Sequence, residues 1–156
     1  MRGWAPSTAR STSLYLYFKS GNGPHINNFG LGRTGRYRTN VWDYPGINTL
    51  RPDRMEELSL HPTVKPVALV ADAIRDCSKP NGVILDAFAG SGTTLIAAER
   101  TGRKAFALEL DPKFIDTAIR RWEAFTSNTA THAATGSSLT ELAVRRAAAL
   151  CISRKS

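Results

Sequence analysis

Residues 85–111, LDAFAGSGTTLIAAERTGRKAFALELD, place two carboxylates around a glycine-rich turn. Asp86 ends a first apolar run, Gly90 and Gly92 follow it, and Glu109 ends a second apolar run. Glycine has no Cβ and tolerates positive φ, so such a turn lets a ligand touch the backbone. An acid at the end of the second strand can accept hydrogen bonds from both hydroxyls of a ribose. The spacing predicts a site for a nucleoside derivative.

Three ligand classes use glycine turns of this kind. A phosphate-binding P-loop reads G-x-x-x-x-G-K-[ST], and no lysine follows a glycine in this chain. A dinucleotide fingerprint reads G-x-G-x-x-G, but Leu95 stands where the third glycine would allow close helix–strand packing. S-adenosylmethionine carries no phosphate, and Asp86 could meet its ammonium or sulfonium charge. The residues exclude the P-loop, weaken the dinucleotide and leave S-adenosylmethionine open.

Two strands and three helices are predicted around the turn. Residues 83–85 are typical of a buried strand, residues 93–101 of a helix that ends at Gly102, and residues 105–108 of the next strand. A helix that starts at Pro66 precedes them, with an apolar stripe that makes Cys77 a buried position, and a helix with a stripe from Phe114 to Trp122 follows. Such a unit opens a doubly wound sheet. The predicted fold class is therefore α/β, with a loop-rich N-terminal region.

Composition divides the chain into four regions. Residues 1–12 are predicted to be disordered, and residues 13–60 to hold an aromatic strand at 14–18, a turn at 20–23, long loops and a short strand at 39–42. Residues 61–126 form the α/β unit. Residues 127–156 read as a linker followed by an amphipathic helix over 139–151.

Most of the net positive charge of the chain lies outside the glycine-rich unit. Residues 1–60 carry 8 Lys+Arg against 4 Asp+Glu, residues 61–126 carry 9 against 8, and residues 127–156 carry 4 against 1. Basic flanks beside a neutral unit suit a surface that meets a polyanion, although solubility alone explains them as well. The two cysteines form no C-x-x-C motif and no segment reaches the ~20 apolar residues of a membrane span, which favours a cytoplasmic protein.

Three motifs together carry a family resemblance. DAFAGSGTT at 86–94 resembles the cofactor motif of the DNA amino-methyltransferases that modify adenine N6 or cytosine N4. HPTVKP at 61–66 is similar to their second cofactor motif, which in one subclass lies just upstream of the glycine motif, and VWDYP at 41–45 is similar to the segment before it. The resemblance covers about residues 41–126. It implies a partial Rossmann-like, S-adenosylmethionine-dependent methyltransferase fold, seen here as a C-terminal portion.

The resemblance also implies roles for single residues. Thr63 and Lys65 would hold the methionine carboxylate, and Glu109 the ribose. The methionine end of S-adenosylmethionine would be lined by Asp86, Phe88, Gly90, Ser91, Gly92 and Thr93. Ser91 and Thr93 have a simpler alternative role as helix caps. At position 87 this chain has alanine, where the family usually has proline. A proline would only stiffen the turn, so the change is expected to make the turn less rigid without altering its chemistry.

The chain lacks the family's catalytic tetrapeptide. The motif [N/D/S]-P-P-[Y/F/W] orients the target amine and stacks the extruded base, and it occurs nowhere in residues 1–156. Asp43-Tyr44-Pro45 has one proline, and its aromatic residue precedes that proline. No catalytic residue and no metal site are identified. The chain alone is expected to be inactive or very weakly active; the alternative is a catalytically dead DNA-binding or interaction remnant of the same fold.

The N-terminal region is interpreted as a remnant of the target-recognition region. Cations seek phosphates, aromatic rings stack on bases and asparagines read base edges. The residues predicted to contact double-stranded DNA are Arg33, Arg36, Tyr37 and Arg38, with Asn27, Asn28 and Asn40 as base readers. A flexible loop with ordinary surface charge is the alternative. A cognate restriction endonuclease is the second partner that the family suggests.

Overall fold

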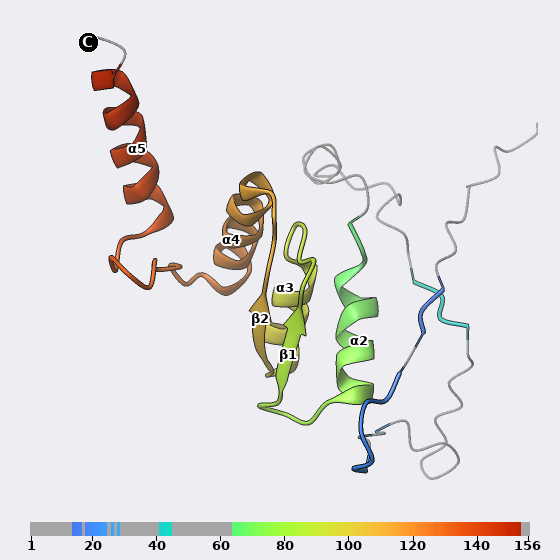
Figure 1. The fold of residues 1–156 in the computed structure, drawn as a ribbon. Coiled ribbons are helices and arrows are strands. Elements are labelled where there is room, and N and C mark those ends of the chain that lie inside the picture. The colour runs from blue at the N-terminus through green and yellow to red at the C-terminus, as the bar shows by residue number, and fades with distance from the viewer. Residues whose placement is uncertain are drawn as a thin grey trace, which may run out of the picture.

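A computed structural model describes residues 14–16, 18–24, 26, 28, 41–44 and 64–153. Within them the chain forms α2 (Val67–Cys77), β1 (Val83–Asp86), α3 (Thr93–Thr101), β2 (Lys104–Ala107), α4 (Pro112–Thr126) and α5 (Leu139–Ser153) (Figure 1). The strands β1 and β2 are parallel, and their register places Val83 opposite Lys104 and Asp86 opposite Ala107. The predicted α/β class and β–α–β unit are confirmed, and β2 begins one residue earlier than expected.

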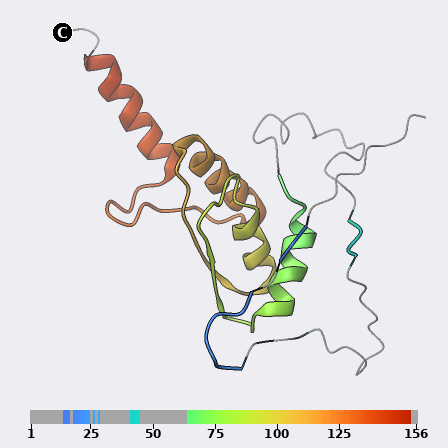
Figure 2. The same ribbon diagram turned by 45° about the vertical axis from the view of Figure 1, so that its right-hand side comes forward.

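The three central helices pack together beside the two strands. The helix α3 contacts β2, with α2 and α4 on either side of it (Figure 2). The core is a cluster of Ala71, Ile74, Ala97 and Ala98, and Ile84 and Ala105 of the sheet pack against it. Because most of these side chains are small, the backbones of α2 and α3 can approach closely.

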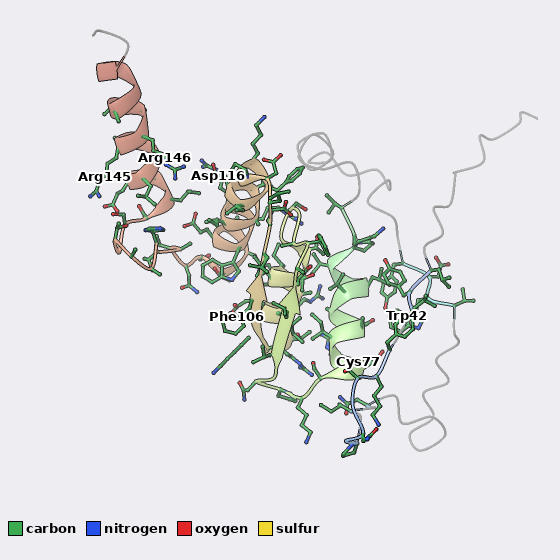
Figure 3. The ribbon with its side chains drawn as sticks, in the orientation of Figure 1. Trp42, Cys77, Phe106, Asp116, Arg145 and Arg146 are labelled. Carbon is green, nitrogen blue, oxygen red and sulfur yellow. The ribbon has the colours of Figure 1, made fainter. Side chains whose placement is uncertain are left out.

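The face of the sheet that does not pack on the helices is exposed to solvent. Side chains alternate between the two faces of a strand, so only every second residue of β1 and β2 can face the helices. The alternate residues Val83, Leu85, Phe106 and Leu108 are each between 61% and 70% exposed. Figure 3 shows Phe106 on the side of the sheet away from α2. The prediction that residues 83–85 form a buried strand is therefore wrong, because no described element covers this second face.

The C-terminal end of α2 is closed by two other segments. The side-chain amide of Asn28 donates from Nδ2 to the carbonyl oxygens of Arg75 (2.7 Å) and Ser78 (3.0 Å), and its backbone N–H donates to Asp76 O at 3.0 Å. The Arg103 side chain donates to the carbonyl and the hydroxyl of Ser78 at 2.9 and 3.0 Å. Helix ends leave carbonyls without helical partners, and these contacts satisfy them. With its amide donors used inside the protein, Asn28 is a poor candidate for the expected reader of base edges.

Cys77 is exposed, which contradicts its predicted burial. The buried line of α2 passes through Ala71 and Ile74 and continues at Ser78, four residues later, so Cys77 falls beside the stripe. Partial desolvation and the neighbouring Asp76 carboxylate raise the pKa of the Cys77 thiol. The helix also begins one residue later than expected, since Pro66 is its N-cap rather than its first residue.

Two expected strands near the N-terminus are absent from the described residues. Residues 14–16 and 18 lie outside any strand, as do Val41 and Trp42, while residues 17, 39 and 40 lie outside the described part. An aromatic stretch forms a strand only where another strand pairs with it, and none does so here in the described chain. The predicted turn is confirmed by bends at 21–23, with Gly21 at φ 81°.

The last two helices begin with side-chain caps. Asp111 caps α4 by accepting a hydrogen bond from Lys113 N at 2.9 Å. A capping box starts α5: Ser138 N–H donates to Glu141 Oε2 (2.8 Å), and Glu141 N–H donates to Ser138 Oγ (3.3 Å). The helix α5 confirms the predicted C-terminal helix and projects beyond α4 in Figures 1 and 2. In the described residues, no helix is long and apolar enough to cross a membrane.

We expect acid to loosen the start of α5. Hydrogen bonds from Ser138, helped by the nearby Arg145 charge, hold the pKa of Glu141 below its ordinary value. A carboxylate with a lowered pKa stabilises the folded helix at pH values above the ordinary glutamate pKa of about 4.3. This contribution is lost as the pH falls through the lower pKa of the folded state. Hydrogen exchange at Glu141 and Leu142 should therefore show less protection in acid than the intrinsic exchange rate predicts.

The control for this prediction is Glu141→Gln. Glutamine also serves in a capping box but does not ionise, so the pH-dependent part of the protection should disappear. The same acid response in both proteins would contradict the assignment to Glu141.

Candidate functional site

The glycine turn connects β1 to α3 with two left-handed residues. Gly90 has φ 52° and Gly92 has φ 80°, and Gly92 is the N-cap of α3 without a side-chain cap. The turn closes through a hydrogen bond from Gly92 N–H to Ala89 O at 2.9 Å. The alternative of Ser91 and Thr93 as caps of α3 is therefore wrong. Both are buried, and Ser91 is held from α4 instead.

Asp86 lies at the carboxyl end of β1 and is oriented from two sides. Its Oδ1 accepts the N–H of Phe88 at 3.0 Å, and its Oδ2 accepts the Thr94 hydroxyl at 2.6 Å. Thr94 lies in the first turn of α3, so the helix that follows the glycines fixes the carboxylate that precedes them. The side chain of Phe88 is 90% exposed at this turn. Asp86 is thus an oriented carboxylate beside the exposed Phe88 ring and the backbone of the glycine turn.

Glu109 joins the glycine turn to the end of β2. Its Oε2 accepts the N–H of Gly90 at 2.7 Å, and its Oε1 accepts the N–H groups of Leu110 and Asp111 at 2.8 and 3.0 Å. A further backbone bond runs from Ala89 N–H to Leu108 O at 3.0 Å. Both oxygens of the Glu109 carboxylate thus accept backbone N–H groups, one from the glycine turn and two from the segment after β2. Glu109 is therefore a structural bridge as well as a candidate hydroxyl acceptor.

The structure gathers most of the predicted site at one end of the sheet. Asp86, Phe88, Gly90 and Glu109 are linked by the hydrogen bonds above, and Ser91, Gly92 and Thr93 continue the same turn into α3. The start of α2, which follows exposed Lys65, lies at this same end in Figure 1. Thr63 and the predicted DNA contacts lie outside the described residues, namely Arg33, Arg36, Tyr37 and Arg38.

Three residues of this region were not assigned a role from sequence. Thr94 orients Asp86, Arg121 binds Ser91, and Ala118 lies against Gly92. Thr94 could have been found, because a hydroxyl in the first helical turn after such a loop can reach back to the strand end. The two α4 residues carry no local signal, since they meet the turn only after the chain has folded.

The segment that resembles the family's VWDYP stretch packs on α2. The hydroxyl of Tyr44 donates to Asp72 Oδ2, and Arg75 binds the other oxygen of the same carboxylate at 2.8 Å. The rings of Trp42 and Tyr44 meet edge to face at 6.4 Å. These contacts give Tyr44 a structural role, in keeping with the interpretation that Asp43-Tyr44-Pro45 is not the catalytic motif.

Replacing Thr94 with valine should weaken the site without unfolding the chain. The change removes the hydroxyl bond to Asp86 while keeping a β-branched side chain of similar shape. Loss of one such bond is expected to cost about 1 kcal/mol of stability and a few-fold in ligand affinity. Chemical denaturation and titration calorimetry measure the two effects. Thr117→Val is the control, because the Thr117 hydroxyl donates to Lys113 O of its own helix, away from the glycine turn. Equal loss of affinity in both variants would contradict the role of Thr94.

Comparisons with known proteins identify the family of this chain. The family model N6_N4_Mtase, described as DNA methylase, matches residues 17–120. The chain is 37% identical over 90 residues to the type II methyltransferase M.ScaI of Streptomyces caespitosus, covering 58% of this chain and 30% of that protein. It is 42% identical over 82 residues to the DNA adenine methyltransferase YhdJ of Escherichia coli (strain K12), covering 53% and 26%.

A solved structure is similar to a smaller part of this chain. The crystal structure of the M1.HpyAVI–SAM complex aligns with a TM-score of 0.38 at 38% identity, over 39% of this chain and 30% of that one. The chain thus spans less than a third of the length of the relatives it matches. Because the family model covers well over half of its residues, this chain belongs to the DNA methylase family.

Proposed function

We propose that this chain forms the S-adenosylmethionine-binding part of a DNA amino-methyltransferase, which methylates adenine N6 or cytosine N4. The observation that carries the proposal is the left-handed turn of Gly90 and Gly92, set between two oriented carboxylates at the carboxyl ends of parallel strands. Family membership supplies the reaction class and supports DNA as the substrate.

The charge of the site fits S-adenosylmethionine better than a dinucleotide. Asp86 and Glu109 both bind amides of the turn, so negative charge is concentrated where a pyrophosphate would have to lie. A phosphate would be repelled there, whereas a sulfonium or ammonium group would be attracted. The described geometry therefore suits a ligand that is cationic near the turn and carries hydroxyls near Glu109.

Each predicted residue has a place in this proposal. Asp86 would attract the cationic end and Glu109 would accept from the ribose hydroxyls. The turn would contribute backbone and Phe88 its exposed ring, while Thr63 and Lys65 would hold the methionine carboxylate. Ser91 would contribute through its backbone N–H, because Arg121 already binds its carbonyl oxygen and its hydroxyl. The residues that would line the methionine end of S-adenosylmethionine are Phe88, Gly90, Ser91, Gly92 and Thr93.

The chain's own contribution is binding and orientation. When bound, S-adenosylmethionine supplies a methyl group on a sulfonium. Steering a base amine toward that methyl needs the acceptor and the stacking ring of the [N/D/S]-P-P-[Y/F/W] motif, which residues 1–156 do not contain. We therefore expect little or no methyl transfer to DNA by this chain alone.

The proposal extends to partners. Arg33, Arg36, Tyr37 and Arg38 would contact double-stranded DNA, and a cognate restriction endonuclease would recognise the same DNA site. An exposed free thiol at Cys77 is compatible with a reducing cytoplasm.

Titration calorimetry of the 156-residue chain tests the cofactor. S-adenosylmethionine and S-adenosylhomocysteine should bind, and NAD should not. Asp86→Asn keeps the shape of the side chain but removes its charge. It should therefore weaken the binding of S-adenosylmethionine, which carries a sulfonium charge, more than the binding of S-adenosylhomocysteine, whose thioether is uncharged. Asp116→Asn on the exposed surface of α4 is the matched control (Figure 3). Binding of NAD instead of S-adenosylmethionine would overturn the proposal.

A second candidate is a catalytically dead DNA-binding or interaction remnant, favoured by the missing tetrapeptide. The DNA upstream of the Met1 codon separates the two. A stretch that encodes the tetrapeptide in frame would indicate a mis-assigned start and support the enzyme, whereas a frameshifted stretch would indicate a degraded gene and, like the absence of any such stretch, would support the remnant. Methyl transfer to DNA by the purified chain would exclude the remnant directly.

A further inference from the structure

The helix α4 reaches the glycine turn through one arginine. Nη1 of Arg121 donates to the carbonyl oxygen of Ser91 at 2.6 Å and to its hydroxyl at 2.8 Å. Ser91 is only 5% exposed and lies between the two left-handed glycines. A buried carbonyl needs a donor, and here the donor is a cation 30 residues further along the chain.

A second contact from the same face of α4 lies next to it. A Cβ on Gly92 would fall 2.7 Å from Cβ of Ala118, so the helix touches the turn backbone directly. Ala118 and Arg121 are three residues apart and share one face of α4. The turn is therefore held from two sides, by Glu109 on the strand side and by Ala118 and Arg121 on the helix side.

We propose that Arg121 is a positioning residue for the cofactor turn, through Ser91. Glycine adopts left-handed and other conformations about equally readily, so a turn with two glycines keeps one shape only where its surroundings fix it. By binding both oxygens of Ser91, Arg121 directs that peptide toward α4 and leaves the turn shaped for a ligand before any ligand arrives. This role rests on the proposed function of the turn, but the shape of the turn can be measured without a ligand.

Hydrogen exchange in the ligand-free chain provides that measurement. The N–H groups of Gly90 and Gly92 are hydrogen-bonded to Glu109 and Ala89, so their protection reports whether the turn is formed. Arg121→Met should speed exchange at both amides about tenfold or more, the effect of losing a charged hydrogen bond. Exchange within α2 should stay unchanged. The adjacent Arg120→Met, on the exposed surface of α4, is the control and should leave the turn as it is.

Rescue separates positioning from general packing. Both contacts to Ser91 come from a single nitrogen, so the ammonium of Arg121→Lys can replace them, and protection of Gly90 and Gly92 should largely return. Ser91→Ala removes only the hydroxyl contact and should have a smaller effect. The variants Arg121→Lys and Ser91→Ala also allow the proposal to be tested if Arg121→Met does not fold.

Calorimetry with S-adenosylmethionine completes the test. We expect affinity to fall about tenfold in Arg121→Met and to recover in Arg121→Lys. Unchanged exchange at Gly90 and Gly92 in folded Arg121→Met, or an equal effect of Arg120→Met, would overturn the role of Arg121. Failure of even the unmodified chain to bind S-adenosylmethionine, with the exchange pattern as expected, would instead overturn the proposed function and leave Arg121 as the holder of the turn.

Discussion

Replacing Gly92 with alanine is expected to lower the free energy of unfolding by about 2–5 kcal/mol, because the change combines overpacking with backbone strain. Gly92 has φ 80°, a conformation that alanine rarely adopts. The added Cβ would also lie 2.7 Å from Cβ and 3.0 Å from Cα of Ala118. The helix α4 would have to move away from the turn, so the hydrogen bonds of Arg121 to Ser91 would be strained as well.

Gly102→Ala isolates the strain. Gly102 has a similar φ of 68°, but an added Cβ there would meet no atom within 4 Å. Its cost should be only about 1 kcal/mol. Urea denaturation of the two variants compares the effects, and equal losses would contradict the packing argument. Ala118→Gly should recover part of the loss in Gly92→Ala, although glycine within a helix itself costs about 1 kcal/mol.

Glu109→Gln is the second change with a large expected effect. The carboxylate accepts N–H groups with both oxygens, whereas the amide has one oxygen and an NH₂ that must face a donor. We expect the unfolding free energy to fall by about 1–3 kcal/mol, since a backbone donor is left without an acceptor. Affinity for S-adenosylmethionine should fall by about 1–3 kcal/mol, or roughly 5- to 150-fold, through weaker bonds to the ribose hydroxyls.

Glu123→Gln is the matched control for this change. Its carboxylate also accepts a backbone N–H, from Ala130 at 2.8 Å, but in the segment that follows α4. Calorimetry with S-adenosylmethionine should distinguish the two variants. Unchanged affinity in Glu109→Gln would remove Glu109 from the ligand site, and unchanged stability would remove its role as a bridge.

The glycine unit could be predicted because its signals are local. Gly102 ends α3 as expected, in the left-handed conformation that favours glycine. Asp86 ends β1, and Glu109 lies two residues beyond the end of β2. Apolar runs and helical periodicity depend only on neighbours in sequence, so they located β1, α3, β2 and α4 to within a few residues. The turn between the strands then follows from chain geometry.

The errors have a common origin in tertiary contacts. The exposure of Leu85 depends on what packs on the sheet, and that of Cys77 on where the stripe of α2 continues. The bond from Arg121 to Ser91 spans 30 residues and shows no pattern along the chain. Residues 14–16 have strand-like composition but no strand to pair with in the described part, so local preference alone predicted a strand that does not form.

The small core has a consequence for how the chain responds to denaturant and heat. Four of the seven buried hydrophobic residues among those described are alanines, and one face of the sheet already meets water. Unfolding of the described part of the chain therefore exposes little new apolar surface. The heat-capacity increment and the urea m-value both scale with that newly exposed surface, so both should be small and the transition broad.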